Sequence, residues 1–310
     1  MATDSYALAI HGGATSLARS GLTEVAEAAI HQDLRQALQA GETVLREGGL
    51  AMDAVLAAVI ELENSPWFNA GRGSALNQDG FCEMDAALMD GRTRAAGAVA
   101  GVRRVRNPIL AARAVMERTP HVLLVGSEAD RFAEGIGLPM AGPEYFITER
   151  RAERLARARS AASTSGQGPS GASPFGTVGA VARDLQGNLA AATSTGGLDG
   201  KLPGRVGDSP LIGAGTYAQN GLCAVSGTGF GEAYIRAVAA HDIASMMQYA
   251  GLDVVEATRR VIEEKVPELG GSGGAIVVDA EGRLTLPFTT DAMYRGWVRS
   301  GAAGETGIFR

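Results

Sequence analysis

The chain has 310 residues, of which 45% are apolar and 20% charged, and its formal net charge is −6. This composition is typical of a globular protein, and its mild acidity argues against a nucleic-acid binder, which would carry a basic stripe. No run of 18 apolar residues occurs, so we expect no membrane span. The N-terminal residues do not read as a signal peptide, so we expect a cytoplasmic protein.

The first part of the chain predicts one strand and two helices. The apolar run at residues 6–10 predicts a buried strand that leads into a glycine turn at residues 11–13. Apolar residues at helical spacing predict a helix over residues 25–47, which Gly48 and Gly49 end. A second helix is expected over residues 51–62.

The middle of the chain mixes strands and helices. Residues 74–89 predict a hairpin with its turn at residues 77–80. Asn107 and Pro108 open a helix that we expect to reach Met116, and residues 122–125 predict a short buried strand. An arginine-rich helix is expected at residues 147–160. Residues 161–173, which follow it, contain no apolar residue larger than alanine and predict a flexible linker.

Ordered structure is expected to resume directly after the linker. We expect strands at 178–182, 189–193, 211–217 and 222–226, helices at 232–250 and 254–265, and a final hairpin of 275–279 with 284–287. Both halves of the chain therefore contribute strands and helices. The linker is either a plain tether between domains or slack chain beside a processing point.

Two glycine-rich segments match known motifs only superficially. Residues 270–274 match Gly-x-Ser-x-Gly, but a helix precedes them and a strand follows, which reverses the context of a nucleophile elbow. We therefore place Ser272 in a turn. Residues 227–232 resemble a dinucleotide loop, except that Glu232 stands where the last glycine belongs. A nucleotide-binding enzyme stays an alternative, although such a turn before a helix also offers N–H groups to an oxyanion.

Cysteine and histidine are too sparse to suggest a metal centre. Cys82 and Cys223 are the two cysteines, and without a secretory signal we expect them to be reduced. The four histidines are far apart and no Cys-x-x-Cys occurs, so we expect no transition-metal site.

Threonine is the residue type whose pattern points to chemistry. Thr177 follows the linker and Gly176, Thr195 ends the next predicted strand, and Thr228 lies in the glycine-rich segment. A threonine hydroxyl needs a base, and an N-terminal threonine supplies its own α-amine. Thr177 gains such an amine only if the Gly176–Thr177 bond is cut. The alternative is that these threonines serve strand formation, which β-branched residues favour.

Arg205 and Asp208 lie close together in a tight segment rich in glycine. An arginine can grip the carboxylate of a free amino acid through two hydrogen bonds, and a carboxylate can hold its ammonium. A surface ion pair between the two residues explains the same pattern, and the motif leaves both interpretations open.

Taken together, the motifs resemble those of plant-type L-asparaginases and isoaspartyl aminopeptidases over nearly the whole chain. They comprise residues 11–14, 68–73, 83–86, 89–91, 96–100, 176–181, 193–197, 203–210, 273–274 and 307–308. The resemblance implies an α+β fold, an αββα four-layer sandwich of the N-terminal-nucleophile (Ntn) hydrolases. It also implies self-cleavage into an α subunit of residues 1–176, ending in a linker at about 161–175, and a β subunit of residues 177–310. Both subunits would build one fold, and two αβ units would form a homodimer.

The resemblance also implies roles for individual residues. Thr177 would be the nucleophile, with Thr195 assisting it and Thr228, the Gly229 N–H and Asn69 stabilising the oxyanion. Arg205 would hold the substrate α-carboxylate. Asp208 would hold the α-ammonium together with Thr228 and a carbonyl of Gly229 or Gly231. The loop at residues 11–13 would adjust the nucleophile. A monovalent cation, Na⁺ or K⁺, would bind main-chain carbonyls of Leu62, Glu63, Ser65, Phe68, Ala70 and Arg72.

The implied reaction is acyl transfer from L-asparagine or a β-aspartyl dipeptide to Thr177, without a required cofactor. The substrate is a small amino acid or dipeptide, with no nucleic acid or membrane as partner. Glycosylasparaginases are related, but residues 173–176 lack the His-Asp pair of that branch. A non-catalytic relative that binds a ligand, or a precursor that never matures, is a different alternative, and the first residue of the smaller fragment distinguishes it.

Overall fold

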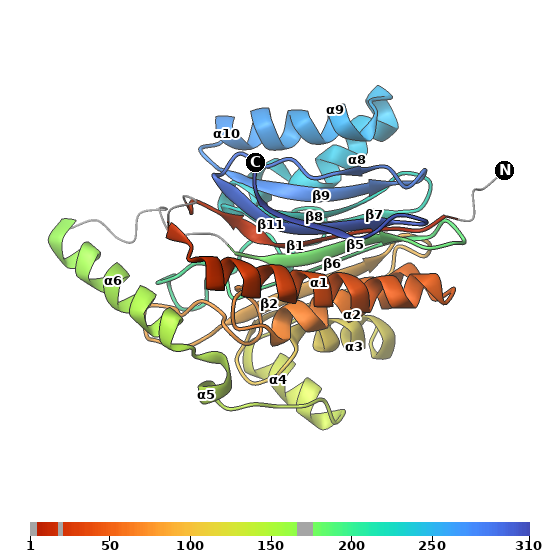
Figure 1. Ribbon diagram of the computed structural model, residues 1–310. Coiled ribbons are helices and arrows are strands. Elements are labelled where there is room, and N and C mark those ends of the chain that lie inside the picture. Colours follow the sequence, from red (N-terminus) through yellow and green to blue (C-terminus); the bar gives the residue numbers. More distant parts are fainter. Residues whose placement is uncertain (1–4, 18–20, 166–175) are drawn as a thin grey trace.

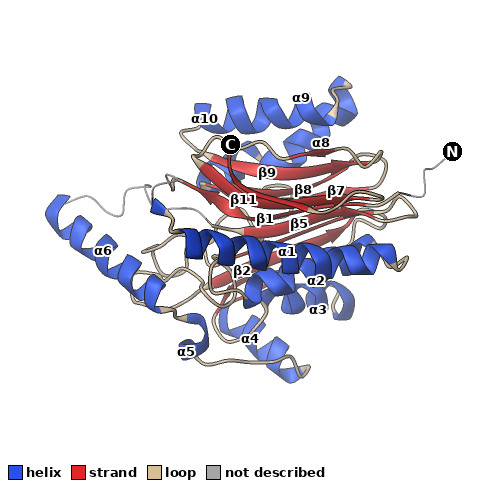
Figure 2. Cartoon of the chain, in the orientation of Figure 1, coloured by secondary structure: helices blue, strands red, loops and turns tan. Residues whose placement is uncertain are grey.

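The computed structural model describes residues 5–17, 21–165 and 176–310. These residues form four layers, in which two stacked β-sheets lie between two layers of helices (Figures 1 and 2). The α+β sandwich implied by the resemblance is therefore confirmed.

The larger sheet is built from both halves of the chain. Its strands run in the order β12-β11-β1-β5-β6-β2-β3-β4, and every neighbouring pair is antiparallel except β3 and β4. Their bounds are β1 Ala7–Thr15, β2 Met84–Asp90, β3 Ala96–Val102, β4 Leu123–Val125, β5 Val178–Arg183, β6 Leu189–Thr195, β11 Ala292–Arg299 and β12 Glu305–Phe309. Strand β5, which directly follows Thr177, thus lies between β1 and β6 in the middle of this sheet.

The smaller sheet comes entirely from the part of the chain after Thr177. Its antiparallel order is β10-β9-β8-β7. The bounds are β7 Thr216–Gln219, β8 Cys223–Gly229, β9 Gly273–Asp279 and β10 Leu284–Thr285. Because β8 is antiparallel to its neighbours, the glycine-rich residues 227–232 lack the parallel βαβ context of a dinucleotide loop.

Helices cover the outer face of each sheet (Figure 1). The layer on the larger sheet contains α1 Glu24–Arg46, α2 Ala51–Asn64, α3 Pro108–Arg118 and α4 Gly126–Gly135. Two further helices, α5 Pro143–Phe146 and α6 Glu149–Ser165, follow α4 in the chain. The layer on the smaller sheet contains α7 Gly231–Ala237, α8 Ala239–Ala250, α9 Val254–Arg259, the π-helical turn η2 Arg260–Lys265 and α10 Val266–Glu268. Helix α6 extends away from the sheets (Figure 1).

Alternate side chains of β1 pack into two different hydrophobic cores. Leu8 and Ile10 belong to the cluster that packs against α1 and α2, while Ala7 and Ala9 belong to the cluster shared with the smaller sheet. Successive side chains of a strand point to opposite faces, so this pattern is expected for a strand buried on both sides.

The predicted glycine turn at residues 11–13 is wrong, because β1 continues through it to Thr15 with a bulge between His11 and Gly13. A Cβ on Gly12 would lie 2.5 Å from the Phe68 ring, and Gly13 has φ +107°. The glycines are therefore needed for close packing and for the bulge rather than for a chain reversal.

The predicted pairing of residues 74–89 is also wrong. The turn forms and is closed by a bridge between Leu76 and Cys82, but β2 pairs with β3 and β6 instead. The strand predicted at residues 122–125 exists as β4, yet it is an edge strand and Val125 is 57% exposed. Strands β3, β11 and β12 and helices α4 and α5 had no counterpart among the predicted elements.

The predicted helices 25–47, 51–62, 108–116 and 147–160 are confirmed within a few residues as α1, α2, α3 and α6. The helix predicted over 232–250 is interrupted at Val238, which has φ 50° and separates α7 from α8. The strand predicted from residue 211 begins at Thr216. Residues 161–165 of the predicted linker belong to α6, and its remainder at 166–173 lies outside the described residues.

Candidate active site

Thr177 lies at the point where the chain enters β5, and the neighbouring strand brings Thr195 to it. The register pairs Val178 with Ser194, so the start of β5 lies beside the end of β6. The Thr177 hydroxyl donates to Thr195 Oγ1 over 3.1 Å. A small pocket opens here, and its lining comprises Gly176, Thr177, Thr195, Gly197, Leu198, Arg205, Gly207, Asp208, Ser209 and Gly229. Six of the predicted site residues are thus brought together.

Thr195 accepts a hydrogen bond from the Thr177 hydroxyl. Its Oγ1 also accepts a hydrogen bond from the Gly197 amide over 3.0 Å, which fixes the position of that oxygen. Both threonines are buried, so bulk water competes little for these contacts. The pair orients the Thr177 oxygen but contains no base, and an α-amine at residue 177 would supply one.

Arg205 and Asp208 lie in the same pocket, but among the described residues they form no ion pair with each other. Arg205 forms two hydrogen bonds to Glu232 at the start of α7, over 3.0 and 2.9 Å. A Cβ on Gly231 would lie 2.9 Å from both Arg205 Nη2 and Asp208 Oδ1, so both groups face this glycine. The surface ion pair considered above is therefore wrong as an explanation of the motif.

Glu232 is a site residue that sequence reasoning missed. In the sequence, Glu232 stands out only because it replaces the last glycine of a dinucleotide-loop motif. Its separation of 27 residues from Arg205 gave no local signal of their contact. The two parallel hydrogen bonds hold the guanidinium plane at the pocket.

Asp208 carries a buried carboxyl group that is available to a ligand. Within the described chain, its Oδ2 has no hydrogen-bond partner, and the residue is 4% exposed. Burial raises the pKa of this carboxyl group to about 7, and the nearby charge of Arg205 only partly opposes the effect. An ammonium group in the pocket would satisfy the carboxylate, because opposite charge favours the ionised form.

The three predicted oxyanion donors occupy different positions. Gly229 lines the pocket, whereas Thr228 lies on β8, where its Oγ1 accepts from the Ala14 amide over 3.0 Å. The Asn69 side chain is engaged, since it donates to Gly197 O and accepts from the Ala75 amide. The main-chain N–H of Asn69 donates to the Gly176 carbonyl over 3.2 Å. Asn69 therefore reaches the Gly176–Thr177 bond through its backbone.

The loop predicted to bind a cation leaves several carbonyl oxygens available. In the described parts of the chain, no hydrogen bond reaches the carbonyl oxygens of Ser65, Phe68, Ala70 or Arg72, while Glu63 O accepts from the Arg72 amide. Hard monovalent cations bind such oxygens, so Ser65, Phe68, Ala70 and Arg72 fit a sodium or potassium ion, whereas the Glu63 carbonyl oxygen is already hydrogen-bonded. The side chain of Glu63 is buried, and burial raises its pKa to about 7.

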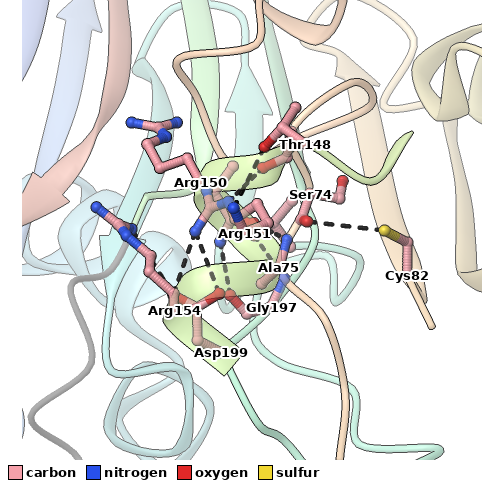
Figure 3. Close-up of polar contacts among 12 residues, drawn as sticks. Ser74, Ala75, Cys82, Thr148, Arg150, Arg151, Arg154, Gly197 and Asp199 are labelled. Atoms are coloured by element: carbon pink, nitrogen blue, oxygen red, sulfur yellow. Dashed lines mark hydrogen bonds and ion pairs between the residues drawn. The ribbon is translucent and has the colours of Figure 1, made fainter. Parts of the chain in front are cut away.

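Three arginines of α6 anchor that helix beside the pocket (Figure 3). Arg151 is buried, donates to Gly73 O over 2.5 Å and pairs with the buried Asp199, whose nearest oxygen is 3.2 Å away. Arg154 reaches the same carboxylate at 3.7 Å, and Arg150 donates to Pro66 O over 2.9 Å. Sequence reasoning identified this helix but missed these contacts, which brace the segments that carry Asn69 and Gly197.

Comparison with known proteins gives one family. A family model described as asparaginase matches residues 4–308. An isoaspartyl peptidase of Salmonella typhimurium is 52% identical over 307 residues, covering 98% of both chains. The isoaspartyl peptidase of Escherichia coli is 51% identical, covering 98% of this chain and 96% of the relative. An isoaspartyl peptidase/L-asparaginase of Mus musculus is 42% identical, covering 96% and 89%.

Two further observations concern the chain as a whole. Among the described helices, none combines the length and apolar character needed to cross a membrane. Cys82 and Cys223 are buried and not bonded to each other, and burial raises the pKa of each thiol to about 12.

Proposed function

The chain belongs to the asparaginase family, that of the plant-type L-asparaginases and isoaspartyl peptidases, and from this premise we propose that it is a self-cleaving threonine hydrolase. Its substrates are L-asparagine and β-aspartyl dipeptides. The observation that carries this proposal is the pocket in which Thr177 and Thr195 face the Arg205 and Asp208 side chains.

Maturation begins at the Gly176–Thr177 bond. The Thr177 hydroxyl attacks the Gly176 carbonyl carbon, and the Asn69 N–H stabilises the oxygen that becomes negative. The hydroxyl proton is transferred to the departing nitrogen as the C–N bond breaks, so Thr177 gains a free amine and Gly176 becomes an ester on the threonine oxygen. Water hydrolyses this ester, which leaves residues 1–176 and residues 177–310 as two chains that are no longer covalently joined. The α-amine has an ordinary pKa of about 7.7–8.0, so a useful fraction is neutral near pH 7.

Hydrolysis uses the same hydroxyl a second time. Arg205 holds the substrate α-carboxylate and Asp208 its α-ammonium, which places the side-chain carbonyl at Thr177. The α-amine takes the hydroxyl proton as Thr177 attacks, and ammonia or an amino acid leaves with a proton. Water then attacks the β-aspartyl ester and regenerates the threonine. Oxyanion donors such as Gly229 N–H, with Thr228 close by, contribute several kcal/mol in typical acyl transfer.

The remaining parts of the proposal concern assembly and environment. Two αβ units form a homodimer in the cytoplasm, and the enzyme needs no cofactor. A sodium or potassium ion is held by the carbonyl groups of the loop at residues 62–72 and stabilises it. The available carbonyl oxygens described above support this assignment.

Steady-state kinetics on the matured protein test the function. We expect hydrolysis of both L-asparagine and a β-aspartyl dipeptide. Arg205→Ala should lower kcat/KM about 30-fold or more, because losing one partner of a desolvated charge pair costs about 2–5 kcal/mol. Arg205→Lys should restore only part, since an ammonium lacks the planar fork. Unchanged kcat/KM in matured Arg205→Ala would show that Arg205 does not hold the substrate α-carboxylate.

A further inference from the structure

A line of buried polar side chains leads away from the Thr177 carbonyl. His11 Nδ1 lies 2.8 Å from Thr177 O, and its Nε2 lies 2.9 Å from Ser226 Oγ. Thr193 Oγ1 lies 2.7 Å beyond Ser226, and Thr216 Oγ1 lies 2.6 Å beyond Thr193. These four side chains come from β1, β8, β6 and β7 and are fully buried. The reaction proposed above uses none of them.

The acceptor at one end sets the direction of every hydrogen bond in the line. A carbonyl oxygen only accepts, so His11 Nδ1 must carry a proton. Burial lowers the pKa of His11 to about 3, and the ring is therefore neutral with a bare Nε2. Ser226 must then donate to Nε2, which leaves Thr193 to donate to Ser226 and Thr216 to donate to Thr193. Each hydroxyl has one proton, and no other order satisfies all four contacts.

We infer that His11 is a positioning residue, held as the Nδ1–H tautomer by the Thr216–Thr193–Ser226 hydroxyl chain, and that it fixes the nucleophile through the Thr177 carbonyl. This inference rests on the proposed role of Thr177. His11 makes no contact with the Thr177 hydroxyl among the described contacts, so it acts through the backbone. Fixing that carbonyl sets the orientation of the α-amine and Oγ on the same residue.

Two glycines, Gly179 and Gly215, lie beside this line of side chains and support its role. A Cβ on Gly179 would lie 2.0 Å from Ser226 Oγ and 2.6 Å from His11 Nε2, so the contact between them requires glycine there. At the far end, Gly215 precedes Thr216 and its amide donates to Asp208 O over 3.1 Å. The line therefore joins the nucleophile to the segment that carries the ammonium-binding carboxylate.

The tautomer can be read directly from the ring nitrogens. In protein labelled with ¹⁵N-histidine, we expect the His11 spectrum to show a protonated Nδ1 and an unprotonated Nε2 at neutral pH. Loss of the His11 signals in His11→Asn identifies them among the four histidines. A proton on Nε2, or on both nitrogens, would overturn the inference.

Paired substitutions separate positioning from bulk stability. An asparagine amide can take the place of imidazole Nδ1, whereas a glutamine amide takes the place of Nε2. We therefore expect matured His11→Asn to keep at least about tenfold more kcat than His11→Gln, with similar KM, because one net hydrogen bond of about 1.4 kcal/mol is tenfold. Equal kcat values would contradict the inference.

Thr193→Val tests the hydroxyl chain against a matched control. Both Thr193 and Thr258 are fully buried, and Thr258 Oγ1 donates to Val254 O within α9. We expect both valine variants to lose thermal stability, but only Thr193→Val to lose kcat. Equal kcat values in Thr193→Val and Thr258→Val would contradict the proposed role of the hydroxyl chain. Absence of hydrolysis in the unmodified matured protein would refute the proposed function instead, and the nitrogen spectrum would still decide the tautomer.

Discussion

At the residue scale, Asp208 combines a buried carboxyl group with a raised pKa of about 7. In the proposed reaction the substrate ammonium binds the ionised form of Asp208, so kcat/KM should fall as the pH drops below about 7. The Thr177 α-amine, with an ordinary pKa of about 7.7–8.0, must also lose its proton. Well below both values, log kcat/KM should change by about two per pH unit, and by about one in Asp208→Asn. Equal slopes in the two pH profiles would show that Asp208 does not titrate in this range.

Asp208 and Asp199 are both buried, but replacing each by asparagine should change the melting temperature in opposite directions. The folded-state pKa of Asp208 is raised, so its contribution to stability is present at low pH and is lost as the pH rises through about 7. Asp208→Asn should therefore melt at a higher temperature than the parent at pH 8. Asp199→Asn should melt lower, because Arg151 would lose its buried partner, at a cost of about 3–5 kcal/mol.

Thermal unfolding of the two variants and the parent at the same pH measures this difference. A lower melting temperature for Asp208→Asn than for Asp199→Asn at pH 8 would mean that the Asp208 carboxylate is satisfied in the free enzyme.

At the element scale, the bulge in β1 lies against the proposed cleavage site. Gly13 has φ +107°, and a Cβ there would lie 2.3 Å from the Cα of Gly176. Gly13→Ala should slow self-cleavage at least about tenfold, because Gly176 would have to move away from the Thr177 hydroxyl. Gly48→Ala is the control, since Gly48 also has positive φ, at +82°, but has nothing within 4 Å of the added carbon. A time course of fragment appearance on a denaturing gel compares them, and equal rates would contradict this role of the bulge.

Elements with a strong local pattern could be predicted from the sequence, and those without one could not. Helix α1 has apolar residues at helical spacing and a Thr23 cap that accepts from the Ala26 amide, and its predicted bounds were nearly right. Strand β3 reads Ala-Gly-Ala-Val-Ala-Gly-Val, whose small residues give little signal. Its Gly97 is required because a Cβ there would lie 2.1 Å from Ala112 O of α3, a contact that only the folded structure reveals.

Site residues, too, divide into those that a sequence motif predicts and those that it does not. Thr177, Thr195, Arg205 and Asp208 belong to ordered motifs, and the structure gathers them in one pocket. Other contacts join residues that lie 27 to 215 positions apart in the sequence, so no local pattern predicts them. They are the contacts of Glu232, Arg151 and His11 Nε2. The main-chain hydrogen bond from Asn69 to the Gly176 carbonyl could not be predicted either, because a motif identifies a side chain and not the direction of the main-chain N–H.

At the scale of the whole molecule, sheet order makes the two proposed subunits inseparable. Strand β1 lies between β5 and β11, so the part before Thr177 pairs on both edges with the part after it. We expect the two fragments to elute together in size-exclusion chromatography after cleavage and to separate only in denaturant. Separation under native conditions would contradict one fold built from both.

The central claim is that Thr177 becomes the N-terminal nucleophile. Intact-mass analysis and N-terminal sequencing of the active, matured protein test it most directly. We predict two fragments, residues 1–176 and residues 177–310, with the second beginning at Thr177, and only the uncut chain in Thr177→Ala. Full hydrolytic activity from an uncut chain, or from a fragment that begins at another residue, would contradict the claim.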